Sequence, residues 1–84
     1  MKKVHDVYSV SGDETHLYIT VDGKSYRLRW MDCSQRLMDA TQAQRERIEV
    51  SPSGYGIHWP DIDEDLAITP LLEHAEPLPT EAVG

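Results

Sequence analysis

The 84-residue sequence contains one cysteine, no phenylalanine and no long run of apolar residues. Its single cysteine, Cys33, excludes an internal disulfide and favours a reducing, cytoplasmic setting. No apolar segment approaches the roughly 20 residues that a membrane-spanning helix requires. The start, MKKVHDVYSV, also lacks the apolar centre of a secretory signal. We therefore expect a small cytoplasmic protein that has no membrane partner.

Basic residues are missing from the C-terminal part of the chain. Residues 51–84 hold seven acidic residues and no Lys or Arg, and the formal net charge of −7 arises there. Proteins that bind nucleic acid need a basic surface to neutralise phosphates, and the overall charge opposes that role. An acidic surface suits solubility or a basic partner. A domain of this size buries only about 60% of its unfolded surface, so a partner or a homo-oligomer would stabilise it.

The clearest local pattern is HLYITVDGKSYRLRW at residues 16–30. Asp22-Gly23 is typical of a two-residue hairpin turn, because both positions tolerate a positive φ. This turn sets the register of the two strands and gives them an apolar and a polar side. Three pairs share the apolar side: Val21 with Lys24, Ile19 with Tyr26, and Leu17 with Leu28. Two pairs share the aromatic and basic side: Tyr18 with Arg27, and His16 with Arg29.

Short helices are predicted from their capping residues. Asp32 is positioned to cap a helix over about 33–39. Thr41 and Gln44 form a capping box that opens a second helix of about two turns. Thr69 is a further candidate cap, with Pro70 at the first position of a third helix that closes over the sheet.

The remaining patterns complete an α+β domain. Residues 4–10 are rich in Val and Tyr and predict a first strand. IEVSPSGYGIHW predicts a second hairpin, in which Ile48 and Val50 oppose Ile57 and Tyr55. We expect one small domain over residues 1–74, with an antiparallel sheet of two hairpins and short helices packed on one face. Residues 75–84 are rich in Pro and acidic residues and predict a disordered tail.

The stretch SGYGIHWPDIDEDLAI at residues 53–68 gathers the candidates for a metal site. Asp61, Asp63 and Asp65 alternate like the first ligands of a calcium loop. The sixth position of such a loop needs Gly and here holds Leu66, and the bidentate Glu of the twelfth position is also missing. His58 with either of the first two aspartates is the remaining candidate for a transition metal or an enzymatic site. The alternative is an acidic, solvated corner. This alternative is favoured because so few of the ligands that a metal site requires are present.

Evidence for catalysis is weak. Cys33 and the four histidines allow a Cys/His pair, but the predicted helix buries Cys33, and buried cysteines usually act as small hydrophobes. Neither a G-x-S-x-G elbow nor a phosphate-binding loop is present. His58 is a candidate proton shuttle, or an exposed strand histidine opposite Arg47. We predict a non-enzymatic protein without a cofactor, and assign no catalytic residue.

The polar side of the first hairpin is a second candidate surface. His16, Tyr18, Arg27 and Arg29 share this side, where bases could stack on an exposed sheet. The alternatives are a solvated face with cross-strand cation–π pairs and a contact surface for another protein, since Tyr and Arg carry much binding energy at interfaces. A nucleic-acid-associated regulator therefore stays an alternative function.

Two motifs resemble a known family. R-L-x-x-A-T-x-x-Q-R spans Arg36 to Arg45, and GYGIHWPDIDEDLAI follows at residues 54–68. Over residues 4–73 the chain resembles domain of unknown function 2442, a family of small bacterial proteins. The resemblance implies a compact α+β domain with an antiparallel sheet and short helices. It assigns no activity and no catalytic residue. It also implies an antitoxin-like role, because many relatives occur beside a second small gene in a toxin–antitoxin-like arrangement.

Together these observations predict a protein-interaction module, antitoxin-like, whose partner is a small, basic, toxin-like protein. The acidic segment 61–65 would steer that partner electrostatically. The alternative is a metal-binding, small-molecule or enzymatic site around residues 58–65. The candidate interaction residues are His58, Trp59, Asp61, Asp63, Glu64, Asp65, Tyr18, Arg27 and Arg29.

Overall fold

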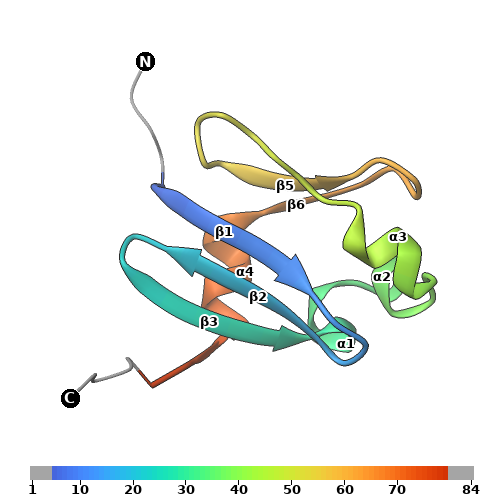
Figure 1. Ribbon diagram of the computed structural model, residues 1–84, viewed down its shortest axis with the longest axis horizontal. Coiled ribbons are helices and arrows are strands. Elements are labelled where there is room, and N and C mark those ends of the chain that lie inside the picture. Colours follow the sequence, from blue (N-terminus) through green and yellow to red (C-terminus); the bar gives the residue numbers. More distant parts are fainter. Residues whose placement is uncertain (1–4, 80–84) are drawn as a thin grey trace.

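The computed structural model describes residues 5–79, which form an α+β domain with two antiparallel sheets and short helices (Figure 1). The strands are β1 (Val7–Gly12), β2 (His16–Val21), β3 (Lys24–Arg29), β4 (Glu49–Val50), β5 (Gly56–Trp59), β6 (Glu64–Ala67) and β7 (Glu76–Pro77). The helices are α1 (Trp30–Cys33), α2 (Gln35–Met38), α3 (Gln42–Glu46) and α4 (Ile68–His74). This confirms the predicted fold class. The two predicted hairpins, however, lie in separate sheets, ordered β1-β2-β3-β7 and β4-β5-β6.

The first hairpin has the predicted register. Tyr18 pairs with Arg27, and the other five pairs of β2 and β3 also match the prediction or follow from it. Asp22 and Gly23 form the turn with φ values of 52° and 80°. These positive values explain the Asp-Gly pair, because few other residues adopt that backbone conformation without strain.

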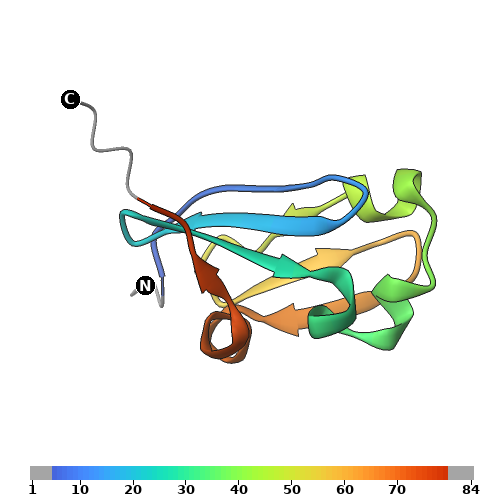
Figure 2. The same ribbon diagram turned by 90° about the horizontal axis from the view of Figure 1, so that it is seen from below.

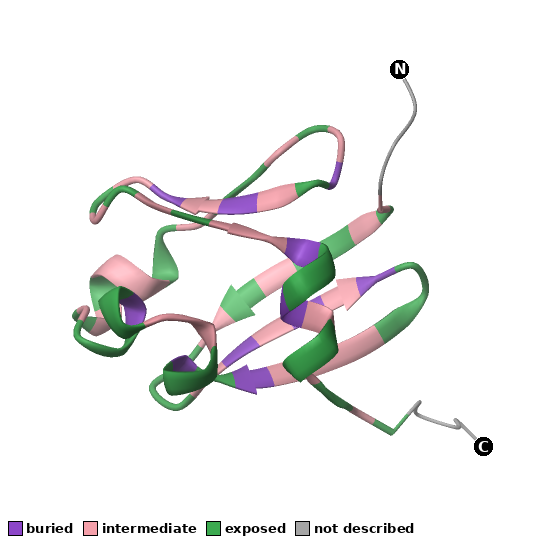
Figure 3. Ribbon diagram, turned by 180° about the vertical axis from the view of Figure 1, so that it is seen from behind, coloured by how far each residue is buried: buried purple, intermediate pink, exposed green. Residues whose placement is uncertain are grey.

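The core lies between the two sheets, which Figure 2 shows as two layers with α1, α2 and α3 at one end. Figure 3 shows that buried and partly exposed residues alternate along β2 and β5, as expected for strands with one face turned inward. One cluster contains all the buried hydrophobic residues of the described chain: Leu17, Ile19, Val21, Leu28, Trp30, Leu37, Ile57, Trp59, Ile68 and Leu71.

Two tryptophans stand edge to face where the layers meet. The ring centroids of Trp30 and Trp59 are 6.5 Å apart, with an interplanar angle of 80°. Each indole N–H donates to a backbone carbonyl: Trp30 Nε1 to Asp13 O at 2.9 Å, and Trp59 Nε1 to Arg45 O at 3.1 Å. Both side chains are therefore buried without leaving an unsatisfied donor.

Arg45 connects the helical end of the domain to this aromatic pair. Its guanidinium carbon lies 5.2 Å from the centroid of the Trp30 ring. Its nitrogens donate to the carbonyl oxygens of Leu37 at 2.9 Å, Met38 at 2.7 Å and Glu14 at 3.2 Å. One side chain thus caps the last turn of α2, holds the β1–β2 turn and covers Trp30.

The predicted helix over 33–39 is interrupted at Ser34, between the end of α1 and the start of α2. Ser34 rather than Asp32 caps α2. Ser34 has an extended backbone, with φ −167° and ψ 158°, which ends α1 and begins α2. Its side-chain oxygen accepts from the Leu37 amide at 3.2 Å. The capping box of Thr41 and Gln44 is confirmed at the start of α3.

The predicted cap of α4 is wrong. The helix begins at Ile68 after an extended Ala67, without a side-chain cap. Thr69 Oγ1 instead hydrogen-bonds His5 Nε2 at 2.7 Å, and His5 Nδ1 bonds Asp22 Oδ2 at 2.8 Å. The Thr69 hydroxyl therefore makes a tertiary contact instead of a cap, and a local capping pattern does not reveal such a contact. The histidine joins the start of the described chain to the β2–β3 turn and to α4.

The second hairpin exists, but its register differs from the prediction. Val50 pairs with Ile57 rather than with Tyr55. The connection is longer than predicted because the Ser51 side-chain oxygen accepts from the amides of both Tyr55 and Gly56, each at 3.1 Å. Residues 51–55 therefore form the loop.

The acidic segment is a turn followed by a strand rather than only a solvated corner. It turns at residues 60–63 and returns as β6, which pairs with β5. Asp63 adopts a φ of 51° in this turn. Arg36 Nη1 donates to the carbonyl oxygens of Ile62 and Asp63 at 3.3 and 3.2 Å, which fixes the turn against α2.

The described fold continues past residue 74, the predicted end of the domain. Glu76 and Pro77 form β7 beside β3, and the Leu78 amide donates to the Ser25 carbonyl oxygen at 2.9 Å. Residues 80–84 of the predicted tail and residue 4 of the predicted first strand lie outside the described residues. In the described part, no helix is long and apolar enough to cross a membrane.

Gly54 is predicted to tolerate no side chain. It has a φ of 72°, and a Cβ there would overlap the carbonyl oxygen of His5. Gly23 is a matched control, with a φ of 80° and open space around it. In urea unfolding, we expect Gly54→Ala to lower the free energy of unfolding by about 2–4 kcal/mol and Gly23→Ala by about 1 kcal/mol. Equal losses for the two variants would contradict the close approach of residue 54 to the His5 backbone.

Candidate functional site

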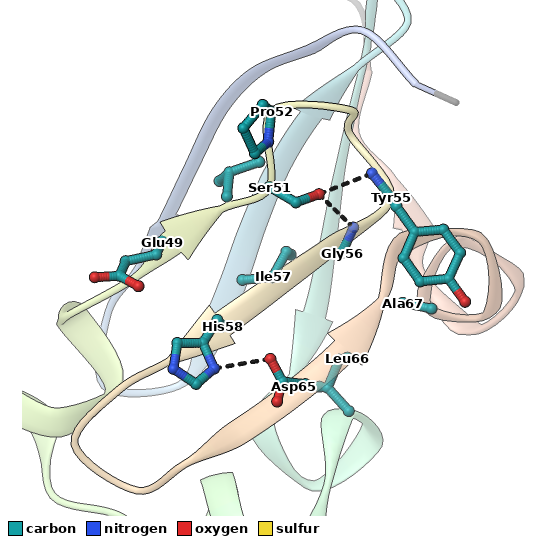
Figure 4. A pocket seen from close by; sticks show the side chains of 11 residues that line it. Glu49, Ser51, Pro52, Tyr55, Gly56, Ile57, His58, Asp65, Leu66 and Ala67 are labelled. Carbon is teal, nitrogen blue, oxygen red and sulfur yellow. Dashed lines mark hydrogen bonds and ion pairs between the residues drawn. The ribbon is translucent and has the colours of Figure 1, made fainter. Parts of the chain in front are cut away.

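Three polar side chains form a row across the outer face of the β4-β5-β6 sheet. The register places Glu49 opposite His58 and His58 opposite Asp65 (Figure 4). His58 Nδ1 lies 2.8 Å from Asp65 Oδ1. The imidazole is 33% exposed and the Asp65 carboxylate 75% exposed. An imidazole between two strands that carry carboxylates is thus open to solvent on this face.

An apolar groove of about 660 Å³ begins beside this row. Gly56 and Ala67 are paired across β5 and β6, and their small size leaves the sheet surface hollow. Tyr55, which is 60% exposed, and Pro52 border the hollow in Figure 4. A Cβ on Gly56 would lie 3.1 Å from the Leu66 carbonyl oxygen, so glycine permits both the hollow and the close approach of β6.

The groove combines an apolar surface with carboxylates at one end. Glu49 and Asp65 supply two negative charges on either side of His58. An extended cationic side chain has a matching shape and charge, because Lys and Arg bury an aliphatic stem while their head groups seek carboxylates. The arrangement is therefore suited to binding such a side chain.

The predicted acidic residues separate into different environments. Asp61 does not line the groove, and its Oδ1 accepts from Arg47 Nη1 at 3.3 Å. Asp63 is exposed at the tip of the β5–β6 turn. Glu64 is partly exposed, and its Oε1 accepts from the Asp65 amide at 3.2 Å.

His58 and Trp59, which adjoin in the sequence, lie on opposite sides of β5. Trp59 is fully buried in the core, whereas His58 points into the groove (Figure 4). His58 faces Glu49 rather than Arg47, because the register of the second hairpin differs from the prediction. The alternation of a strand therefore assigns packing to the tryptophan and solvent exposure to the histidine.

A possible metal-ligand set differs by one residue from that expected. Ligand atoms of His58, Asp63 and Asp65 lie within 4.8 Å of one another. Asp61, which the sequence paired with His58, is engaged by Arg47 instead. The set brings together one imidazole and two carboxylates, the donor types that Zn²⁺ and Mn²⁺ accept.

The second candidate surface, on the β2-β3 hairpin, is neutralised by acidic neighbours. Three contacts do this: Tyr18 OH to Asp13 at 2.8 Å, Arg27 to Glu76 at 2.9 and 3.3 Å, and Arg29 to Asp32 at 2.9 and 3.4 Å. Hydrogen bonds from the His16 and Thr15 amides and from the tyrosine lower the pKa of Asp13 well below its usual value. A phosphate would have to compete with these carboxylates, so the geometry does not favour nucleic acid here.

Most residues of the groove are not predicted from the sequence. His58 and Asp65 were identified as candidates, but Glu49, Pro52, Tyr55, Gly56 and Ala67 were not assigned to a site. The missing information was the pairing of β5 with β6. A second alternating stretch after Pro60 was the available signal, and it was obscured by the acidic residues of the turn.

The chain is similar to a known protein family and to a solved structure. The model of a family of proteins of unknown function, DUF2442, matches residues 7–77. A solved structure of a protein of unknown function from Rhodospirillum rubrum is similar, with 22% sequence identity and a TM-score of 0.72; the alignment covers 82% of this chain and 86% of that one. At this identity the likeness shows the fold alone. No curated protein matches the chain.

Cys33 is predicted to be unreactive in the folded protein. Burial, followed by the charge of Asp32, raises the pKa of its thiol to about 12. At pH 8 we expect labelling by a disulfide reagent to be at least about 100-fold slower than in urea, because the thiolate is the reactive form. Stopped-flow absorbance gives both rates. Comparable rates in the two conditions would show that the thiol is accessible and ionised.

Proposed function

The chain belongs to the DUF2442 family of proteins of unknown function, and from that premise and the geometry of the groove we propose that it is a protein-interaction module. Its β4-β5-β6 sheet binds a basic segment of a partner protein. The observation that carries this proposal is the Glu49–His58–Asp65 row at the end of an apolar groove. A lysine or arginine of the partner places its stem on Gly56 and Ala67 and its charge between the carboxylates.

The charge distribution supports a basic partner. Residues 51–84, which supply most of the groove, carry acidic residues and no Lys or Arg. Such a field increases the rate of encounter with a basic protein and lowers that rate as salt is added. Asp61, Asp63 and Glu64 act in this way at a distance. A small, basic, toxin-like protein, as the family resemblance implies, is one partner of the proposed chemistry, with the present chain in an antitoxin-like role.

A peptide titration tests the groove. The probe is an extended peptide with one lysine between apolar residues, and a norleucine peptide of the same sequence controls for the stem. We expect amide NMR shifts at Gly56, His58 and Ala67 with the lysine peptide. Asp65→Lys should weaken binding about tenfold or more, because it places like charge beside the ligand.

Asp61→Lys is the matched control, because Asp61 pairs with Arg47 and does not line the groove. It should change the affinity less than about twofold at 150 mM salt. Equal binding of the norleucine peptide, or an equal loss with Asp61→Lys and Asp65→Lys, would refute a charge-specific groove. Amide spectra of both variants without peptide establish that they are folded.

A metal site is a second candidate, favoured by the proximity of His58, Asp63 and Asp65. Titration calorimetry with ZnCl₂ and MnCl₂ tests it. A bound ion should release or absorb measurable heat and raise the melting temperature, since it binds the folded state preferentially. Asp63→Asn should abolish both effects and Asp61→Asn should leave them intact. The absence of heat and of any melting shift in the unmodified protein would end this candidate.

A further inference from the structure

The edge of β3 is already occupied by a short segment of the same chain. The strand β7 contains only two residues, whereas β3 contains six. Three contacts hold the segment: Arg27 pairs with Glu76, Tyr26 pairs with Pro77, and the Leu78 amide donates to the Ser25 carbonyl oxygen at 2.9 Å. The described structure therefore contains an example of the peptide chemistry that this edge accepts.

Charge and backbone both contribute to this contact. Arg27 Nε and Nη2 donate to the two carboxylate oxygens of Glu76 at 2.9 and 3.3 Å. The two-pronged contact lowers the pKa of Glu76 and raises that of Arg27. Pro77 follows, and the alternation of a strand turns its backbone nitrogen away from β3, so its missing N–H costs no hydrogen bond.

The pairing stops at a hollow that the segment does not fill. The register would place residue 74 opposite Arg29, but His74 ends α4, and Ala75 leads the chain from the helix into β7. A hollow of about 440 Å³ lies at this point. Its lining is mostly polar and holds two arginines, two acids and two histidines: His16, Arg27, Leu28, Arg29, Asp32, His74 and Glu76. The arginines are already paired, Arg27 with Glu76 and Arg29 with Asp32.

We propose that the β3 edge is a docking site for an extended acidic segment of another protein, and that β7 is the chain's own weaker occupant. The incoming segment adds a strand to the sheet, as in other cases of β-strand addition. It repeats the acid-proline-apolar order of residues 76–78 and carries a further acid two positions earlier, opposite Arg29. This acid enters the hollow, where the helix prevents the chain's own segment from pairing.

The need for a longer segment follows from effective concentration. β7 competes as part of the same chain, with a high local concentration set by the short connection from α4. A partner segment with only the same contacts would lose this competition. Extra backbone pairing gives it the advantage, and its second acid contacts Arg29 in competition with Asp32. This site lies on the other sheet from the proposed groove, so each can fail without the other.

The test uses the full chain and the synthetic peptide Asp-Ala-Glu-Pro-Leu-Pro. We expect amide NMR shifts at Ser25, Arg27 and Arg29. Glu76→Ala removes the ion pair that holds β7 on β3 and leaves the edge of β3 intact. The Glu76→Ala variant should therefore bind the peptide about two- to five-fold tighter than the unmodified chain. Replacing the peptide's aspartate by lysine should weaken binding about tenfold, because it opposes Arg29.

Arg27→Glu is the complementary variant, and it should lose peptide binding while keeping the dispersed amide spectrum of a folded chain. Glu73→Ala is the matched control for the removal of one exposed acid, because Glu73 does not line the hollow; its affinity should equal that of the unmodified chain. Absence of shifts at Ser25, Arg27 and Arg29 in the Glu76→Ala chain at millimolar peptide would overturn the proposal. So would an equal affinity for the aspartate and lysine peptides.

Discussion

Arg45 makes the contacts on which the arrangement of the whole domain depends. Its guanidinium covers Trp30 and binds the carbonyl oxygens at the end of α2 and in the β1–β2 turn, while its own carbonyl oxygen accepts from Trp59. One residue thus connects the two tryptophans, which belong to different layers. Residues 5–79 contain ten buried hydrophobic residues. With so small an apolar core, such a polar junction helps to fix the angle of the layers, which apolar packing alone specifies weakly.

Because the core residues lie on the inner face of the second sheet, its outer face can carry polar side chains. Strand alternation places Ile57 and Trp59 in the core and His58 outside. The same alternation makes His58 the centre of a row with Glu49 and Asp65. Packing and recognition therefore use neighbouring residues of one short strand. A one-residue slip in β5 would exchange the two roles, which makes the register of this sheet central to any activity.

The sequence predicted local structure better than long-range pairing. The Asp22-Gly23 turn fixed the register of β2 and β3, and the Thr41–Gln44 box fixed the start of α3, because both signals act within a few residues. The role of Thr69 was not predictable, since it depends on His5, which is distant in the sequence. The groove was missed for a related reason: its floor is formed by Gly56 and Ala67, which meet only through the pairing of β5 with β6.

The bridge from His5 to Thr69 also has a consequence for the order of folding. The two hairpins close over short loops, which is fast because little chain entropy is lost. The bridge joins residues separated by 64 positions, and its other imidazole nitrogen holds Asp22 of the first hairpin. The complete bridge requires the β2–β3 turn, α4 and the start of the described chain to lie together. The histidine is thus a late contact, whose loss should accelerate unfolding far more than it slows folding.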